Sequence, residues 1–153
     1  MHDRPPELFL VDILISINKV QRKTNGLSFE QFFSNEDVVD VTMRNLEIIG
    51  EATNQLLKIP NFLQETDVEW RKIVNFRNIL AHFYFGIDFK LVFNEIIKEE
   101  VPLLEQEILS FMRRREEGAL FAKAIKGAIA DLEKLHHYQS IAYLKKIEKI
   151  LRD

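Results

Sequence analysis

The sequence has 153 residues, of which 46% are hydrophobic and 29% are charged, and its formal net charge is −3. This length suits a single domain with a buried core. The charge argues against a protein that binds nucleic acid through its overall charge, although it allows an enzyme with a local basic cleft. The absence of cysteine excludes a disulfide framework and a thiolate zinc site.

The most apolar run, residues 8–17, gives no sign of a membrane protein. Asp12 interrupts it, and it is too short to span a bilayer. It also lacks the small-residue cleavage site of a secretory signal peptide. We therefore expect a soluble, cytoplasmic protein that does not contact a membrane.

Apolar residues recur at helical spacing along the whole chain, and no stretch alternates as a β-strand does. The sequence therefore predicts an all-α protein. Pro5 and Pro6 favour the start of a first helix, and Asn25-Gly26 supply a left-handed stop. Residues 28–31 have the pattern of a capping box and predict a short second helix.

A long third helix is expected to begin after Asn35, which can cap it, and to end near Lys58, just before Pro60. Its core-facing side is predicted from the apolar positions Val38, Val41, Ile48, Ala52, Leu56 and Ile59. The many phenylalanines of the chain are expected to fill the core.

The fourth helix is expected to be capped by Asp67 and stopped by Gly86. Asp88 should open the helix that follows. We expect a kink or a new start at Pro102, because proline fits the first turn of a helix and not its interior.

Two amphipathic segments, residues 121–135 and 141–151, follow Gly118 and predict an αα-hairpin. Gly118 marks the plausible domain boundary. We therefore expect a helical bundle over residues 1–116 and a hairpin extension over residues 117–153, which would serve packing or partner binding.

The segment 77–84 is the most informative part of the chain, because four of its side chains are polar: Arg77, Asn78, His82 and Tyr84. Buried polar groups cost free energy unless they find partners, so a helix that only fills a core seldom carries so many. Arg77 is a fixed cation with a planar fork suited to phosphate. Histidine exchanges a proton near neutral pH. Arg77 and His82 together could perform phosphodiester chemistry without a metal.

The order of these residues, Arg-polar-x3-His-x-Tyr, resembles the motif of the HEPN superfamily and, within it, of the HepT-like toxins. Residues 44–52 are similar to a second signature of that family, and residues 70–73 and 84–88 flank the motif as they do there. The resemblance extends roughly over residues 4–116.

The resemblance implies a HEPN-type up-and-down helical bundle, here with the extra C-terminal αα-hairpin. It also implies a metal-independent endoribonuclease without a cofactor, acting as the toxin of a HepT/MntA-type toxin–antitoxin system. In this family two copies of the motif line one cleft between the protomers of a homodimer. A minimal nucleotidyltransferase antitoxin attaches AMP to a tyrosine, which corresponds here to Tyr84. The substrate would be RNA.

Within that scheme, His82 would transfer protons and Arg77 would hold the scissile phosphate and stabilise its transition state. Asn78 would support them by contacting a phosphate oxygen or orienting His82. A charged stripe on the third helix is a possible part of the cleft or of the interface: Asp40, Arg44, Glu47 and Glu51. Of these, Arg44 and Glu51 are expected to be structural or interface-forming.

The spacing of the two catalytic candidates raises a geometric question. Residues five apart on a straight helix differ by roughly 140°, so Arg77 and His82 would not share one face. Either the helix distorts near Ala81, or the site is completed across a symmetric dimer.

Other interpretations remain open. A histidine on an aromatic-rich helix is often a hydrogen-bonded core residue, and Arg77 alone would usually be an ion-pair partner of Glu47, Glu51 or Asp40. The chain could also be a non-catalytic substrate-binding subunit of a nucleotidyltransferase, with Arg77 and His82 holding a nucleotide phosphate. A purely structural dimer with a buried polar network would make both side chains inaccessible to solvent.

A metal site is not expected. His136 and His137 are adjacent instead of being spaced as i,i+4, and no thiolate is available.

Overall fold

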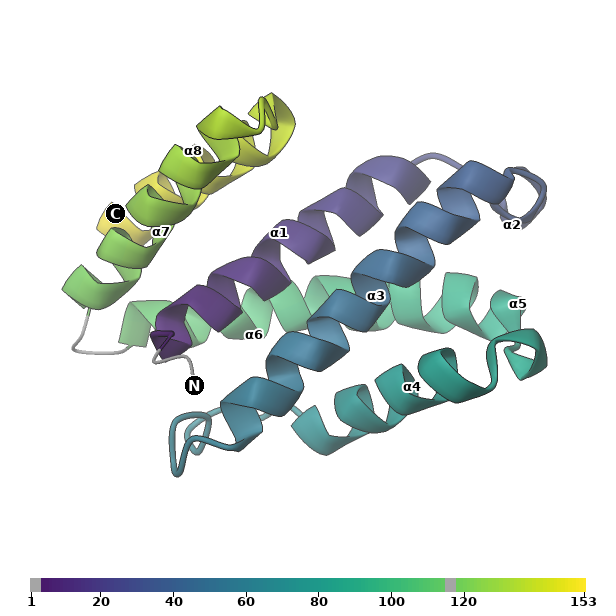
Figure 1. Cartoon of the computed structure of the whole chain (residues 1–153), viewed down its shortest axis with the longest axis horizontal. Helices are drawn as coiled ribbons and strands as arrows, with labels where there is room; N and C mark the ends of the chain where they lie inside the picture. Colours follow the sequence, from purple (N-terminus) through teal and green to yellow (C-terminus); the bar gives the residue numbers. More distant parts are fainter. Residues whose placement is uncertain (1–3, 115–117) are drawn as a thin grey trace.

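The computed structural model describes residues 4–114 and 118–153. Every regular element within these ranges is helical, so the predicted all-α class is confirmed (Figure 1). None of the described helices is both long enough and apolar enough to cross a membrane.

The first two helices follow the sequence signals. α1 (Pro6–Thr24) begins with proline, and the chain turns behind it at Gly26, whose φ is +79°. α2 (Phe29–Phe33) has the predicted capping box. The hydroxyl of Ser28 accepts from the backbone N–H of Gln31 at 3.1 Å, and the Gln31 side chain accepts from the Ser28 N–H at 2.9 Å.

α3 (Glu36–Leu57) is capped by Asn35 as predicted, with the Val38 N–H donating to the Asn35 side chain. Its predicted core face is partly wrong, because Val41 is exposed. The buried apolar side chains are Val39, Met43, Leu46, Ile49, Ala52 and Leu56.

Buried polar residues explain this displacement of the α3 core face. The Thr53 hydroxyl donates to the Ile49 carbonyl at 2.7 Å, and the Asn45 amide donates to the Val41 carbonyl at 2.8 Å. Small polar side chains satisfied by their own helix can be buried at little cost, so the hydropathy pattern did not show that Asn45 and Thr53 belong to the buried face.

α4 (Trp70–His82) begins later than predicted. Its N-terminal flanking residue is Glu69, which makes no capping hydrogen bond, so the prediction of Asp67 as the cap is wrong. The first turn is held instead by the Trp70 indole, which donates to the Thr66 hydroxyl at 2.6 Å.

α4 also ends earlier than predicted. The Phe83 N–H closes the last turn on the Ile79 carbonyl at 2.8 Å, and a 3₁₀ turn follows at Tyr84–Gly86. Gly86 is not the stop, since it does not adopt positive φ. His82 is therefore the last residue of the helix.

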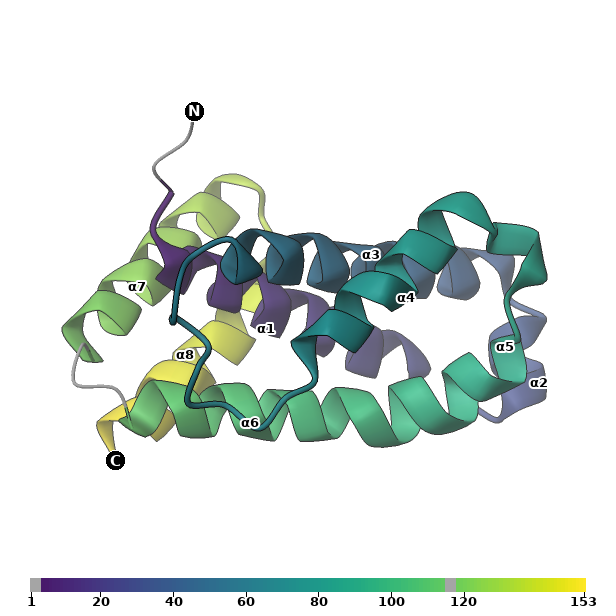
Figure 2. The same ribbon diagram turned by 90° about the horizontal axis from the view of Figure 1, so that it is seen from below.

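The chain then forms one long rod along the lower edge of Figure 2. α5 (Phe89–Leu91) is capped by Asp88 as predicted, π-type turns follow at Val92–Glu100, and α6 spans Val101–Arg114. α6 starts at Val101, directly before Pro102, and its ribbon runs on from the preceding turns without a break (Figure 2). A new start is therefore observed, because the hydrogen bonding changes from π-type to α-type directly before the proline.

The hairpin of α7 (Gly118–Lys134) and α8 (Tyr138–Arg152) is confirmed, with a left-handed residue, His136, in its turn. It packs on α1 and α6. The Tyr143 hydroxyl of α8 donates to Glu105 of α6 at 2.6 Å. The predicted boundary between residues 116 and 117 lies outside the described residues, so the division into two units stays a prediction.

α1 is the central helix of the protein. It contacts α3, α6, α7 and α8, and Figure 1 shows it between the hairpin and α3. Six of its apolar side chains are completely buried: Leu10, Val11, Ile13, Leu14, Ile17 and Val20. α4 instead packs mainly on α3 and buries few side chains, so most of its surface faces outward.

Candidate functional site

The four polar residues of the motif lie at the C-terminal half of α4 and just beyond it. Arg77 is half-buried against α3, whereas Asn78 and His82 are exposed. Tyr84 is half-buried in the 3₁₀ turn. These exposures contradict the interpretation of a buried polar network, in which His82 would be inaccessible to solvent.

Gly50 determines where the Arg77 side chain starts. A Cβ atom at position 50 would overlap the Cβ of Arg77 and would lie 2.7 Å from its Cγ. Only glycine therefore lets α3 and α4 approach this closely. The stem of Arg77 lies across Gly50 and is held in one direction by this contact.

The guanidinium of Arg77 is only loosely paired. Its Nη1 donates to the Asn78 side chain at 3.0 Å, and its Nη2 lies 4.0 Å from the Glu51 carboxylate. One third of the side chain is exposed (32%). A partly solvated pair at this distance contributes little stability, so a phosphate can compete with Glu51 for the cation.

Glu51 is shared between two arginines. Arg44 lies 3.6 Å from the same Glu51 oxygen and also pairs with Glu47 at 2.9 Å. Three residues of the expected α3 stripe, Arg44, Glu47 and Glu51, thus form an ion-pair cluster with Arg77 of α4. The alternative interpretation, in which Arg77 is an ion-pair partner, is met only by the loose contact with Glu51 at 4.0 Å.

The His82 side chain makes no hydrogen bond or ion pair within the described parts of the chain. α4 stays helical up to this residue, and its last turn closes regularly from Phe83 to Ile79. The helix therefore does not distort near Ala81, and Arg77 and His82 point in different directions, as five-residue spacing on a straight helix requires.

Tyr84 lies beside Asp40, the first charged residue of the α3 stripe. Partial burial raises the pKa of the Tyr84 hydroxyl, and the charge and hydrogen bonding of Asp40 raise it further. The Tyr84 ring makes edge contacts with Phe85 and Phe89 at centroid distances of 5.8 and 5.9 Å. The phenol is therefore held in place next to a carboxylate.

Three apolar side chains around His82 are exposed, and we call Ile79, Phe83 and Phe85 the exposed apolar patch. Phe83 is 68% and Phe85 100% exposed. The expectation that the phenylalanines fill the core is therefore wrong for this part of the chain. Patches of this kind commonly mark surfaces that another chain covers.

Residues 13–111 match the family model described as "Ribonuclease HepT-like". The chain belongs to the HepT-like ribonuclease family. This confirms the family expected from the motif. The matched region contains the motif segment 77–84 and the α3 stripe, whereas the α7–α8 hairpin of this HepT-like protein lies beyond it.

Proteins similar to this HepT-like chain are named as ribonucleases. A Methanocaldococcus jannaschii protein named "Putative RNase" is 39% identical over 113 residues, covering 71% of this chain and 97% of the relative. A Caldanaerobacter subterraneus protein named "Putative RNase" is 31% identical over 114 residues, covering 74% and 99%. The "Probable ribonuclease HepT" of Thermococcus cleftensis is 32% identical over 99 residues, covering 63% and 86%. No solved structure shows a significant match to the chain.

Two features of the site were missed at the level of the sequence. Gly50 lies inside the family signature, but its role depends on the contact with Arg77. A glycine in the interior of a long helix was the available signal, because it weakens the helix unless a close approach requires it. The second feature is the exposed apolar patch, for which sequence gives no comparable signal.

No cluster of three or more histidine, aspartate or glutamate side chains that could hold a metal occurs in the described parts of the chain.

Proposed function

We propose that this HepT-like protein is a metal-independent endoribonuclease whose active site forms between two copies of the chain. One observation carries the proposal. Arg77 is fixed by Gly50 and loosely paired, while His82 ends the same helix exposed and without a partner in the described chain. An oriented cation for phosphate and an unengaged proton carrier are the two groups that RNA transesterification needs.

In the proposed reaction, a ribose 2′-oxygen attacks the neighbouring phosphorus while the bond to the 5′-oxygen of the next nucleotide breaks. One imidazole takes the proton of the 2′-hydroxyl, and a second gives a proton to the leaving 5′-oxygen. Arg77 binds the phosphate and stabilises its added negative charge, and Asn78 keeps the guanidinium in place. The products are a 2′,3′-cyclic phosphate and a 5′-hydroxyl.

The dimer supplies what one chain lacks. Arg77 and His82 diverge on a regular α4, so a phosphate held by Arg77 of one protomer would be reached by the partner's His82. An isologous interface would bring both motifs to one cleft. The exposed apolar patch around His82 supports this arrangement, because a second copy would remove it from water.

We further propose that the protein is the toxin of a toxin–antitoxin pair and that a minimal nucleotidyltransferase antitoxin attaches AMP to Tyr84. The phenol oxygen would bond to the α-phosphorus of ATP as pyrophosphate leaves, and the phenol proton would pass to a nearby carboxylate such as Asp40. The added phosphate would pair with the nearby arginines and block RNA.

The test compares RNA cleavage by the wild type, His82→Ala and Arg77→Ala in EDTA, with analysis of the RNA termini. We expect both variants to lose cleavage by at least about a hundredfold while keeping their helical circular dichroism. Arg71→Ala removes an exposed arginine from the same helix and should cut normally. Cleavage that persists in a folded His82→Ala would refute the catalytic role.

A wild type that cuts no RNA would first be checked by mass spectrometry for AMP on Tyr84. If it is unmodified and inactive on varied RNAs, the non-catalytic nucleotidyltransferase subunit replaces the nuclease as the function.

A further inference from the structure

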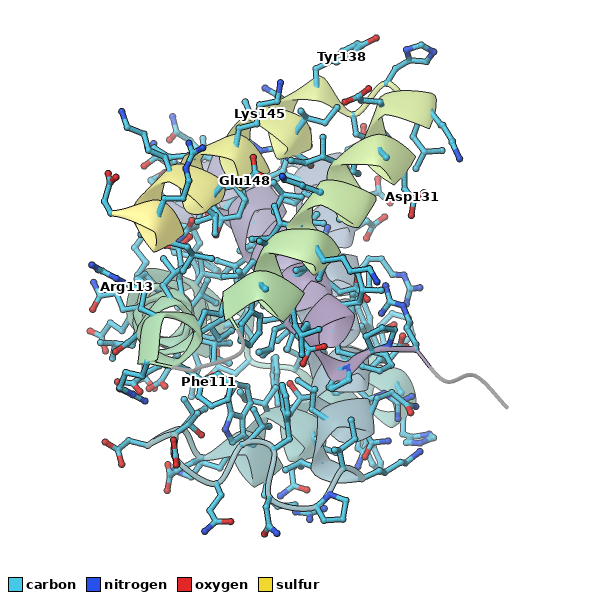
Figure 3. The ribbon with its side chains drawn as sticks, turned by 90° about the vertical axis from the view of Figure 1, so that its left-hand side faces the viewer. Phe111, Arg113, Asp131, Tyr138, Lys145 and Glu148 are labelled. Carbon is cyan, nitrogen blue, oxygen red and sulfur yellow. The ribbon has the colours of Figure 1, made fainter. Side chains whose placement is uncertain are left out.

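A second polar site lies away from α4, where the hairpin turn meets the C-terminal end of α1. The two elements and one side of α3 enclose a surface hollow of about 460 Å³. Figure 3 shows Tyr138, a residue of its wall, at the tip of the hairpin. The hairpin therefore builds a surface that the HepT-like region alone would not have.

The walls of the hollow are positively charged. Lys19, Arg22 and Lys23 line it, and no aspartate or glutamate of the described residues does. No ion pair among residues 4–114 and 118–153 involves any of the three cations. In a chain with a net charge of −3, three such cations around one hollow form a local site for an anion.

Arg22 is held rigidly by neutral partners. Its Nε donates to Asn18 at 2.8 Å, its Nη1 to Gln139 at 2.6 Å and its Nη2 to Ser140 at 3.2 Å. These bonds link α1 to the start of α8 and occupy three of the five N–H donors of a guanidinium. A fixed cation with two donors left is preorganised for a phosphate oxygen. Partial burial lowers the pKa of Arg22, as expected for a cation without a counter-charge.

The hollow borders the charged stripe of α3. Its α3 wall is formed by Val41 and Asn45, and Arg44 of the α3 stripe lies between them in sequence. Residues three apart on a helix differ by roughly 60° around its axis, so Val41 and Arg44 are neighbours on the helix surface. A single polyanionic strand crossing the exposed side of α3 would meet both sites.

From this geometry we infer that the hollow binds a backbone phosphate of the RNA substrate outside the cleft. The inference rests on the proposed ribonuclease function. It assigns the hairpin a role in substrate binding, with Arg22 as the fixed cation and Lys19 and Lys23 as mobile ones. RNA that reaches beyond the cleft is bound by these cations as well, and RNA that only fills the cleft is not.

The test measures RNA binding in a non-cleaving His82→Ala background, by fluorescence anisotropy at several salt concentrations. Lys19→Gln/Lys23→Gln removes two cations that make no hydrogen bonds or ion pairs in the described chain. The matched control, Lys145→Gln/Lys146→Gln, removes two exposed cations from α8 outside the hollow (Lys145 in Figure 3). Labelled single-stranded RNAs of roughly 4 and 12 nucleotides probe the cleft alone and the longer path.

We expect the hollow variant to bind the longer RNA more weakly, with a salt slope smaller by about 0.7 for each phosphate that it no longer neutralises. Its affinity for the short RNA should equal that of the control. Equal affinities of the hollow variant and the control for the longer RNA would overturn the inference, as would an equal weakening on both RNAs.

Cleavage by the same variants with His82 restored separates this inference from the proposed function. If the wild type cuts RNA and the hollow variant binds and cuts like the control, the nuclease stands and the phosphate site fails. If binding depends on Lys19 and Lys23 but the wild type does not cut, the phosphate site stands and the nuclease fails.

Discussion

α1 and α4 are both amphipathic helices, yet the protein uses them in opposite ways. α1 contacts α3, α6, α7 and α8 of its own chain, and six of its apolar side chains are completely buried. α4 packs mainly on α3 and leaves Ile79, Phe83 and Phe85 exposed around His82. The first helix supplies much of the buried core, whereas the second has the exposed surface on which the proposed chemistry and association depend. Substitutions should therefore separate stability from function.

The largest effect on stability is expected in α1. Leu14→Ala removes a completely buried side chain and should lower the free energy of unfolding by about 2–5 kcal/mol. Urea denaturation followed by circular dichroism measures this change. Leu135→Ala, at a side chain that is 60% exposed, makes the same chemical change and should stay within about 0.5 kcal/mol of the wild type. Similar destabilisation in the two variants would contradict the central position of α1.

A smaller effect on stability, with a large one on activity, is expected at the contact between α3 and α4. Gly50→Ala places a methyl group against Arg77, so it should destabilise the fold by about 1–3 kcal/mol and displace the arginine. RNA cleavage measured where the variant is still folded should fall well below that of the wild type.

The control for this substitution is Gly127→Ala, at a helical glycine with no atom within 4 Å of an added Cβ. It should stabilise the protein slightly, by up to about 1 kcal/mol, because alanine favours the helix. Normal cleavage by a folded Gly50→Ala would show that the close approach does not orient Arg77.

Tyr143→Phe tests how the hairpin is attached to α6, and we expect it to lower the free energy of unfolding by about 1 kcal/mol, because it removes the hydrogen bond to Glu105.

The same residue should make stability depend on pH. Burial and Glu105 raise the pKa of Tyr143 above its ordinary value. The folded protein therefore keeps this proton above about pH 10, where the unfolded chain releases it, and stability falls as the pH rises. The variant should lose less stability than the wild type between neutral pH and about pH 10.5 in urea titrations. An identical alkaline decline would contradict the raised pKa.

Phe85→Ala should have the smallest effect on the stability of the single chain, because this side chain is fully exposed. Its effect should instead appear in assembly. If the exposed apolar patch is the dimer surface, the dissociation constant should rise by about tenfold or more, as measured by analytical ultracentrifugation. Leu103→Ala, at a side chain that is 58% exposed on α6, should leave it unchanged. A monomeric wild type would contradict the cleft between two copies.

The sequence was sufficient for features whose cause is local. The capping box at Ser28, the cap at Asn35 and the proline start of α1 depend on neighbouring residues, and all three are confirmed. The motif also led to the correct family. The predictions failed where hydropathy and composition do not show which side chains the fold buries or uses as caps. The buried face of α3 was only partly predicted, because Asn45 and Thr53 are buried with their side chains bonded to carbonyls of their own helix.

The candidate site could likewise be predicted only in part from the sequence. The positions of Arg77 and His82 could be chosen from their chemistry and order. The fit of Arg77 over Gly50, the sharing of Glu51 between two arginines and the exposure of Phe83 all depend on the approach of α3 to α4. No pattern in either helix alone contains that information.

The exposed apolar patch has a consequence for how activity depends on abundance. If the catalytic cleft needs two copies of the chain, the amount of active species at low expression grows with the square of the chain concentration. Halving the abundance then reduces activity by about fourfold under dilute conditions, since mass action governs association. A cell that holds the protein below the dissociation constant of the dimer would then be protected by dilution alone.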